Sequence, residues 1–209
     1  MIKSYLAPVG YVENTIVIEH SKFIGYVCNA ESEIEAKEFV EKIKKQNSLA
    51  THNCYAFITN LGQSVKFSDD GEPTGTAGMP ILEAIKNNKL LNTVVVVTRY
   101  FGGIKLGVGG LVRAYTNCVV EAIQNSLIKE FVLCKEVNII ISYENFTAFQ
   151  NYLNVNKIIV ISTEYGENIN CIIAVSVEIY EEKLKEITDY MQGKLQITEG
   201  KENFFPINN

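Results

Sequence analysis

The chain has 209 residues, of which 47% are hydrophobic and 21% charged, and its formal net charge is −5. This composition is typical of a soluble globular protein with room for one large or two small domains. No apolar run is long enough to span a membrane, and the N-terminal stretch resembles no signal peptide, so we expect a cytoplasmic protein without membrane contact. The five cysteines include no Cys-x-x-Cys pair, which indicates reduced thiols rather than disulfides or a zinc site.

In the first half of the chain, short runs of apolar and β-branched residues predict strands. These runs cover residues 11–19, 21–29, 53–59 and 64–68. Between the second and third runs, Ser32 and Glu35 form a capping box, and apolar residues at helical spacing follow it. The fourth run leads into DDGEPTGTAGMP, which lacks apolar periodicity and therefore predicts a loop. Pro80 then lies in the first turn of a predicted helix.

A run of four valines, residues 94–97, predicts a fully buried strand. It ends at Arg99 and two aromatic residues, a glycine-rich turn follows, and LVRAYTNCVVEAIQNSLI predicts a long helix. A strand that feeds a glycine-rich loop and then a helix directs free backbone N–H groups toward one point, which favours an anion. The alternative is a tight turn that binds nothing.

The second half shows a clearer pattern, in the order βαββαβ of a ferredoxin-like sandwich. The predicted elements cover residues 137–142, 143–153, 157–165, 170–180, 181–192 and 194–199. We expect the remaining polar tail, KENFFPINN, to be mobile; the alternative is that Phe204 and Phe205 dock on the domain. Residues 1–136 carry 14 cations and 14 anions, whereas residues 137–209 carry 5 cations and 10 anions, which places the whole −5 in the second part. We therefore predict two domains, residues 1–136 and 137–209.

Only two of the 19 cations are arginines, Arg99 and Arg113, and both flank the glycine-rich turn. Arginine is preferred over lysine where a planar fork must bind phosphate or carboxylate. Residues 84–120 contain five cations and no acid, although a solvated basic face would give the same count. The candidate anion-binding residues are Arg99, Tyr100, Gly102, Gly103, Lys105, Gly107, Gly109, Gly110 and Arg113.

A second candidate site is the acidic loop, with His52 at the start of a neighbouring strand. Its residues are His52, Asp69, Asp70 and Glu72. Such groups serve as acid and base or bind a divalent cation, but the spacing matches no EF-hand, so we predict no metal and no cofactor. Alternatively, Asp69 or Asp70 caps backbone N–H groups, or the acids pair with Arg99, Lys105 or Arg113 and hold the two loops together.

Two weaker patterns involve a thiol and the aromatic residues. Cys54 follows His52 by two residues, which puts both on one face of a strand and makes a Cys–His dyad conceivable, although a buried strand cysteine is the simpler interpretation. Tyr100 and Phe101 offer rings on which bases stack, or they simply pack.

The segments AGMPILEAI and VVVVTRYFGGIKLGVGGLVRAY, following DDGEPTGTAG, closely resemble the signature of the IMPACT/YigZ family, over residues 22–127. The resemblance implies an α+β protein of the bacterial two-domain type. Its first domain would have the fold of a ribosomal protein and elongation factor domain, and its second would be ferredoxin-like. Eukaryotic members act in translational control. By fold-level analogy, the resemblance implies association with the translation apparatus or nucleic acid.

Three functions follow from these patterns. The first is a non-catalytic regulator associated with translation, which binds RNA, the ribosome or another phosphate-bearing ligand through the basic glycine-rich loop. The second is an enzyme or sensor for a small phosphorylated or carboxylated metabolite, with the acidic loop and His52 at its site. The third is a protein–protein adaptor whose acidic second domain contacts a partner of the translation machinery.

Overall fold

The structure is a computed structural model that describes residues 2–207, and it contains two five-stranded sheets. By its internal contacts the chain separates into two compact units. One is Tyr5–Glu130, and the other is residue 131 onward together with residues 2–4. The change from one unit to the other falls within strand β7, Ile128–Ile141, as does the predicted boundary at residue 136. None of the described helices is both long and apolar enough to cross a membrane.

The sheet of the first unit has the strand order β2–β3–β6–β4–β5, with every neighbouring pair antiparallel. Its strands are β2 Tyr11–Ile18, β3 Ser21–Asn29, β4 His52–Thr59, β5 Ser64–Ser68 and β6 Thr93–Tyr100. The central strand β6 contains the four valines, and all four side chains are fully buried. A strand needs such a run only where both faces of its sheet are covered.

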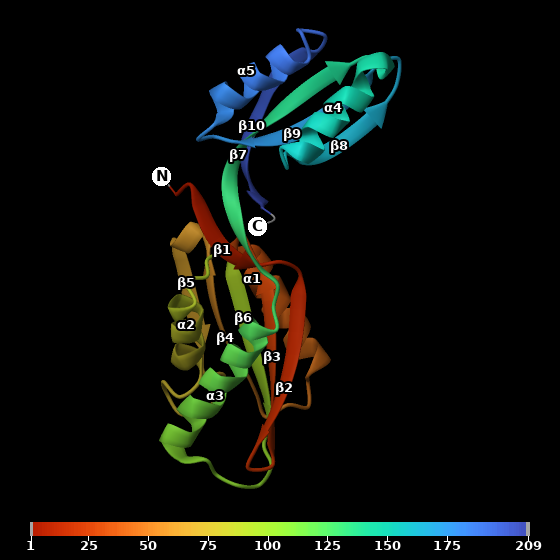
Figure 1. Ribbon diagram of the computed structural model, residues 1–209. Coiled ribbons are helices and arrows are strands. Elements are labelled where there is room, and N and C mark those ends of the chain that lie inside the picture. The colour runs from red at the N-terminus through yellow and green to blue at the C-terminus, as the bar shows by residue number, and fades with distance from the viewer. Residues whose placement is uncertain (1, 208–209) are drawn as a thin grey trace. The chain divides into compact units, whose positions relative to one another are not determined.

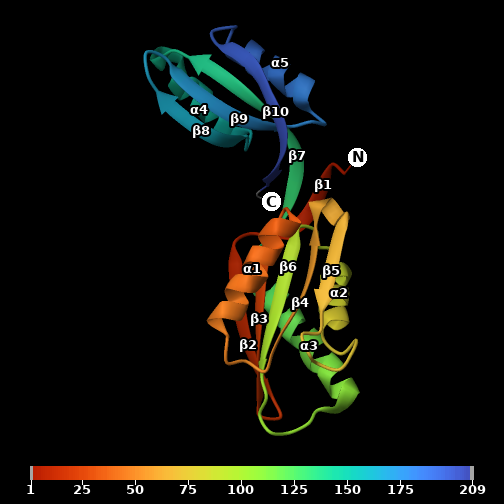
Figure 2. The same cartoon turned by 180° about the vertical axis from the view of Figure 1, so that it is seen from behind.

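Helices cover both faces of this sheet. Helices α2, Gly78–Asn87, and α3, Gly107–Gln124, lie on one face, as Figure 1 shows. Helix α1, Glu33–Gln46, lies on the other face, seen from behind in Figure 2. The valines divide accordingly, because Val95 and Val97 join the α2–α3 core, whereas Val94 and Val96 join the α1 core. Alternate side chains of β6 therefore point to opposite faces of the sheet.

The second unit contains β7, β8 Ile159–Tyr165, β9 Ile169–Ser176 and β10 Gln196–Pro206, with helices α4 Tyr143–Val155 and α5 Tyr180–Tyr190. Its strands run in the order β10–β7–β9–β8, with β1, Ser4–Pro8, as a further neighbour of β7. Side chains of α4 and α5, such as Phe149 and Ile187, pack in one core with the sheet.

The structure corrects several predicted boundaries. Helix α3 begins at Gly107 rather than after the glycines, so Gly107, Gly109 and Gly110 lie in its first turn. The predicted mobile tail is wrong as far as Pro206, because β10 continues through it along β7; the last two residues lie outside the described range. Strand β1 was not predicted, because five residues show too little alternation to mark it. The capping box is confirmed, since the Glu35 N–H donates to Ser32 Oγ at 3.2 Å.

Two glycines beside the start of α3 differ sharply in their surroundings. At Gly102, a Cβ atom would lie 2.0 Å from the backbone carbon of His20, whereas at Gly109 it would meet nothing within 4 Å. We expect Gly102→Ala to destabilise the fold by at least about 2 kcal/mol, because backbone must move to admit the methyl group. Gly109→Ala should stabilise it by about 0.5–1 kcal/mol, since alanine is the better helix former. Urea unfolding of both variants measures their free energies of unfolding. Equal changes in the two variants would contradict the close contact between Gly102 and the His20 backbone.

Candidate functional site

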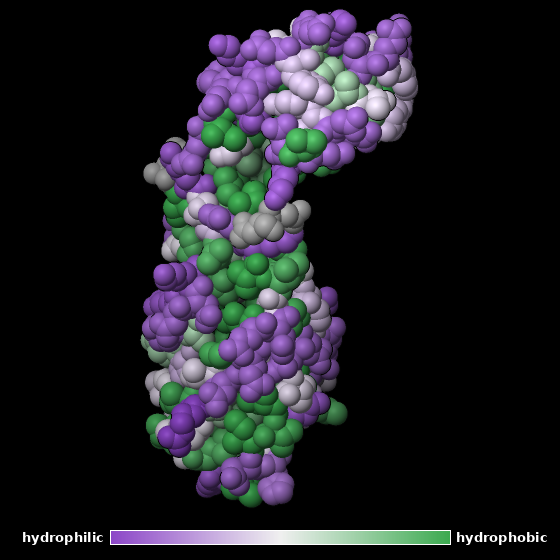
Figure 3. Space-filling model, viewed as in Figure 1, coloured by the Kyte–Doolittle hydropathy of each residue, from purple (hydrophilic) through white to green (hydrophobic). Residues whose placement is uncertain are grey.

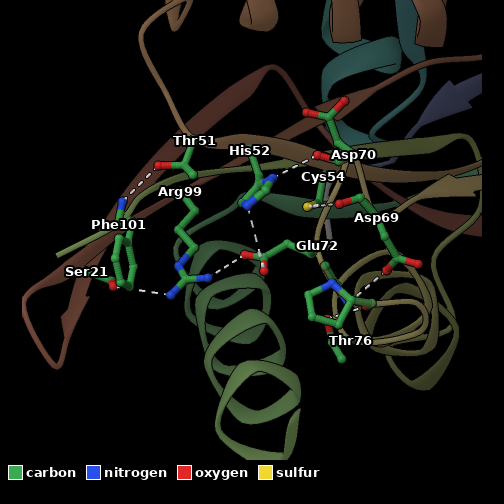
Figure 4. Close-up of polar contacts among 12 residues, drawn as sticks. Ser21, Thr51, His52, Cys54, Asp69, Asp70, Glu72, Thr76, Arg99 and Phe101 are labelled. Atoms are coloured by element: carbon green, nitrogen blue, oxygen red, sulfur yellow. Dashed lines mark hydrogen bonds and ion pairs between the residues drawn. The ribbon is translucent and has the colours of Figure 1, made fainter. Parts of the chain in front are cut away.

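A buried ion pair joins strand β6 to the loop between β5 and α2. Arg99 Nη1 donates to Glu72 Oε1 at 2.6 Å, and the two side chains are only 6% and 3% exposed. Figure 4 shows Arg99, Glu72 and His52 directed toward one another. The pair connects the two loops that the sequence singled out, in the way the pairing alternative describes. Arg99 is therefore already neutralised by a protein carboxylate.

Glu72 has a second donor on the same oxygen. The Tyr115 hydroxyl, from α3, donates to Glu72 Oε1 at 2.9 Å. Burial, followed by the neighbouring Cys54 and Glu72, raises the pKa of Tyr115, so the phenol stays protonated and remains a donor. Burial also raises the pKa of Cys54 to about 12, and its Sγ contacts the Asp69 carbonyl and the Tyr115 hydroxyl rather than His52. This geometry does not support a Cys–His dyad, because a nucleophilic cysteine must be a thiolate.

Arg99 is sandwiched between two aromatic rings and is incompletely hydrogen-bonded. Its guanidinium carbon lies 5.3 Å from the Phe23 ring centroid and 5.4 Å from that of Phe101. Nη2 reaches Ser21 Oγ at 3.4 Å, but the buried Nε has no acceptor among the described residues. An unpaired buried donor is rare because it costs free energy, and it frequently marks a place where a water or ligand binds.

His52 begins β4 and faces the same place. Its Nδ1 lies 2.9 Å from the Asp70 carbonyl oxygen, which only accepts, so Nδ1 carries the proton. When the ring is neutral, Nε2 presents its lone pair, and this nitrogen lies 3.9 Å from Glu72 Oε2. That distance is too long for a hydrogen bond, and both atoms are acceptors. Together they form a pair of acceptors without a donor between them.

The other two acids hold the loop in shape. Asp69 accepts hydrogen bonds from the N–H groups of Gly75, Ala77 and Gly78 at 2.9, 3.0 and 2.8 Å, which caps the start of α2. Asp70 accepts from the Asn53 N–H at 2.7 Å and pairs with Lys44 at 3.4 Å. The predicted capping role of these acids thus agrees with the contacts. Within residues 2–207, no group of three or more His, Cys, Asp or Glu side chains is arranged to hold a metal ion.

Among the described residues, the start of α3 has neither a capping side chain nor an acid in its first turn. Its N-cap is Leu106. The first N–H groups of a helix have no partner inside the helix and carry its positive dipole end. Lys105 and Arg113 beside it are exposed and form no ion pair with any residue between 2 and 207. In Figure 3 the exposed side of α3 is a hydrophilic band bordered by apolar side chains.

The ion pair, His52 and the start of α3 meet in one open cavity of about 460 Å³. It is lined by Thr51, His52, Glu72, Pro73, Arg99, Phe101, Lys105, Leu106, Gly107, Val108 and Leu111. A second cavity of about 460 Å³ shares Lys105 and Leu106 and adds Gly110, Arg113 and Glu19. In each lining the formal charges of two cations and one carboxylate leave one net positive charge, with histidine counted as neutral. The volumes lie in the range of small-molecule sites.

The structure brings together only part of the two predicted sets. Tyr100 points to the α1 face, where its hydroxyl donates to Asn47 Oδ1 at 3.0 Å, so it contacts neither cavity. Asp69, Asp70, Gly102, Gly103 and Gly109 also lie outside both linings. The sequence interpretation missed Ser21, Thr51, Tyr115 and the apolar wall of Leu106, Val108 and Leu111. Part of this wall could have been predicted from the sequence, because the helical spacing of apolar residues in α3 places Leu111 and Tyr115 on one face.

The buried pair makes a sharp prediction about stability. Glu72→Ala leaves Arg99 buried without its carboxylate, and we expect a loss of about 3–5 kcal/mol in the free energy of unfolding. The control is Glu83→Ala, which removes a surface pair with Lys86 whose side chains are about half exposed and should cost less than about 0.5 kcal/mol. Equilibrium unfolding in urea measures both, and similar losses would show that the pair does not organise the fold.

The Asp69 cap predicts a dependence on pH. Burial raises the pKa of Asp69, but its three backbone hydrogen bonds outweigh that effect, and the net direction is downward. A carboxyl whose folded pKa is depressed contributes stability above its unfolded pKa of about 3.9 and loses it as the pH falls through the folded pKa. Asp69→Asn should therefore be less stable than wild type at pH 7, and the gap should shrink below about pH 4. Thermal unfolding between pH 2.5 and 7 tests this, and a gap independent of pH would contradict it.

Comparison with known proteins places this geometry in a family. Residues 19–123 match the model of the Impact N-terminal domain. The chain is 40% identical to the IMPACT family member YvyE of Bacillus subtilis (strain 168), over 96% of this chain and 90% of that protein. It is 30% identical to the IMPACT family member YigZ of Escherichia coli (strain K12), over 94% and 98% of the two chains. A crystal structure of an hypothetical protein superposes with a TM-score of 0.64, at 30% identity over 94% and 97%. This chain therefore belongs to the IMPACT family.

Proposed function

We propose that this protein is a cytoplasmic, non-catalytic regulator of translation that binds RNA phosphates, on free RNA or on the ribosome, through the start of α3. The observation that carries the proposal is the uncapped first turn of α3 beside Lys105 and Arg113, two cations that form no ion pair within the described part of the chain. Backbone N–H groups at a helix start bind phosphate oxygens, and flanking cations add attraction. Family membership supports the link to translation, because the resemblance implies translational control for eukaryotic relatives.

The two arginines differ in their contacts, and we expect them to have different roles. Arg99 is buried and paired with Glu72, so its charge contributes little to the field outside. Arg113 is exposed on α3, less than one turn beyond Gly110, and its side chain is available to bind phosphate. Glu19 lines the cavity beside Arg113 and reduces the local charge, which favours a modest, salt-dependent affinity.

The fold relationships form part of the proposal. The order β7–α4–β8–β9–α5–β10 and the sheet order β10–β7–β9–β8 support a ferredoxin-like second domain. For the first domain we propose the relationship to ribosomal-protein and elongation-factor domains that the sequence resemblance implies. We assign RNA binding to this first domain, because the second part of the chain carries the whole negative charge of −5.

Binding of single-stranded RNA across a salt series tests the proposal. Wild type should bind with an affinity that falls steeply with salt, and Lys105→Ala with Arg113→Ala should weaken binding and reduce the slope of log K against log salt by about 1–2. Fluorescence anisotropy with labelled RNA measures both quantities.

The matched control removes two exposed lysines from α1, on the opposite face of the sheet. Lys42→Ala with Lys45→Ala changes the net charge by the same amount and should leave the salt slope within about 0.3 of wild type. Equal losses in both double variants would indicate unspecific attraction to a charged surface, and no binding by wild type would refute the RNA site.

A further inference from the structure

We infer that the cavity between β4, β6 and the start of α3 binds one ribonucleotide unit, with phosphate, ribose and base each on a different wall. The inference deepens the proposed function, on which its phosphate contact rests, by naming the ligand at the same helix start. Its starting point is that this cavity combines three kinds of unused recognition group. These are donors without acceptors, acceptors without donors, and an exposed aromatic ring.

The donors lie at the start of α3 and on Arg99. Gly107 and Val108 line the cavity with the first, uncapped turn of an 18-residue helix, and Lys105 adjoins them. An independent observation points to the same place. Arg99 lines the cavity, its side chain is only 6% exposed, and its Nε has no acceptor within the described part of the chain. Phosphate oxygens are the acceptors that suit an uncapped helix start and a nearby lysine.

The acceptors are Glu72 Oε2 and His52 Nε2. Glu72 Oε1 already receives Arg99 and Tyr115, so Oε2 is the oxygen that remains. It lies 3.9 Å from Nε2, and the Asp70 carbonyl fixes the proton of His52 on the other ring nitrogen. Two acceptors at this separation repel each other slightly unless a donor enters between them. The two hydroxyls of a ribose supply one O–H donor for each acceptor, whereas a fully ionised phosphate supplies none.

The aromatic ring is Phe101, which lines the cavity and is 46% exposed. Its position is fixed from two sides, because its N–H donates to Thr51 Oγ1 at 3.1 Å and Arg99 packs on its ring. A half-exposed ring that is held in place provides a surface on which a base stacks, whatever the sequence. The apolar residues Leu106, Val108 and Leu111 complete the wall.

One ribonucleotide unit matches this set, and it has two sources, a free nucleoside monophosphate or the end of an RNA chain. The cavity volume of about 460 Å³ suits a ligand of that size rather than several nucleotides. Calorimetric titration of the full chain distinguishes the sources. The probes are the four nucleoside 5′-monophosphates, their 2′-deoxy and 3′-deoxy forms, ribose 5-phosphate, inorganic phosphate and a 5′-phosphorylated RNA tetranucleotide.

We expect at least one monophosphate to bind. Removal of either ribose hydroxyl should weaken binding at least fivefold, because one of the two acceptors then loses its donor. Ribose 5-phosphate should bind at least tenfold more weakly than the nucleoside monophosphate, because it has no base to stack on Phe101. Phe101→Leu should abolish that difference between the nucleotide and the sugar phosphate.

Val108→Asp is the variant that separates binding from folding. Val108 is 66% exposed in the first turn of α3, where a carboxylate suits the helix dipole but repels phosphate, so affinity should fall at least tenfold while Tm is unchanged or rises. Ile34 is the matched control, since it occupies the same position after the N-cap of α1, is 70% exposed and lies on the other face of the sheet. Ile34→Asp should leave the affinity unchanged.

The outcomes separate this inference from the proposed function. Salt-dependent RNA binding without binding of any mononucleotide would overturn the ribonucleotide site and leave the RNA-binding surface standing. If a mononucleotide binds and the tetranucleotide does not, the ribonucleotide site is supported with a free nucleotide as its ligand. The proposed binding of RNA is then refuted. Inorganic phosphate that binds as tightly as the nucleotides, or Val108→Asp that binds like wild type, would also overturn the inference.

Discussion

The first compact unit depends on one buried ion pair, Arg99 with Glu72. Two charges at 2.6 Å in a protein interior lose their hydration, and the cost is offset only when further hydrogen bonds satisfy them. Tyr115 supplies one such bond to Glu72, and the rings of Phe23 and Phe101 pack on the guanidinium. Through these contacts the pair holds together the strand end, the acidic loop and the side of α3, which are distant in sequence.

This arrangement divides the polar residues into an inner and an outer group. Arg99, Glu72 and Tyr115 bind one another and fix the geometry, and they leave only Arg99 Nε and Glu72 Oε2 for a ligand. Lys105, Arg113 and the first turn of α3 keep their charge and their N–H groups available. Because the carboxylate is committed to the arginine, the cavity above it retains a net positive charge. The inner network therefore holds a surface that suits an anion, without contributing much charge itself.

The sequence sufficed to identify the family and most elements, because the valine run, the capping box and the glycine-rich turn each have a local physical cause. It also raised the pairing of the acids with Arg99 as one of two alternatives. It could not choose between them, because the direction of Arg99 depends on register: Arg99 faces His52 across β6 and β4, while Tyr100 turns to α1. The extent of β10 was missed for a similar reason, since KENFFP forms a strand only because β7 lies beside it.

We propose that the start of α3, next to the Arg99–Glu72 pair, binds phosphate. This is measured by an NMR titration of the ¹⁵N-labelled chain with nucleoside monophosphates, in which the chemical shift of each backbone amide is monitored. We predict that the largest shifts fall on the amides of Leu106, Gly107, Val108 and Gly109, because their N–H groups gain an acceptor. Shifts confined to α1, to β5 or to the second unit, with the α3 amides unmoved, would contradict it.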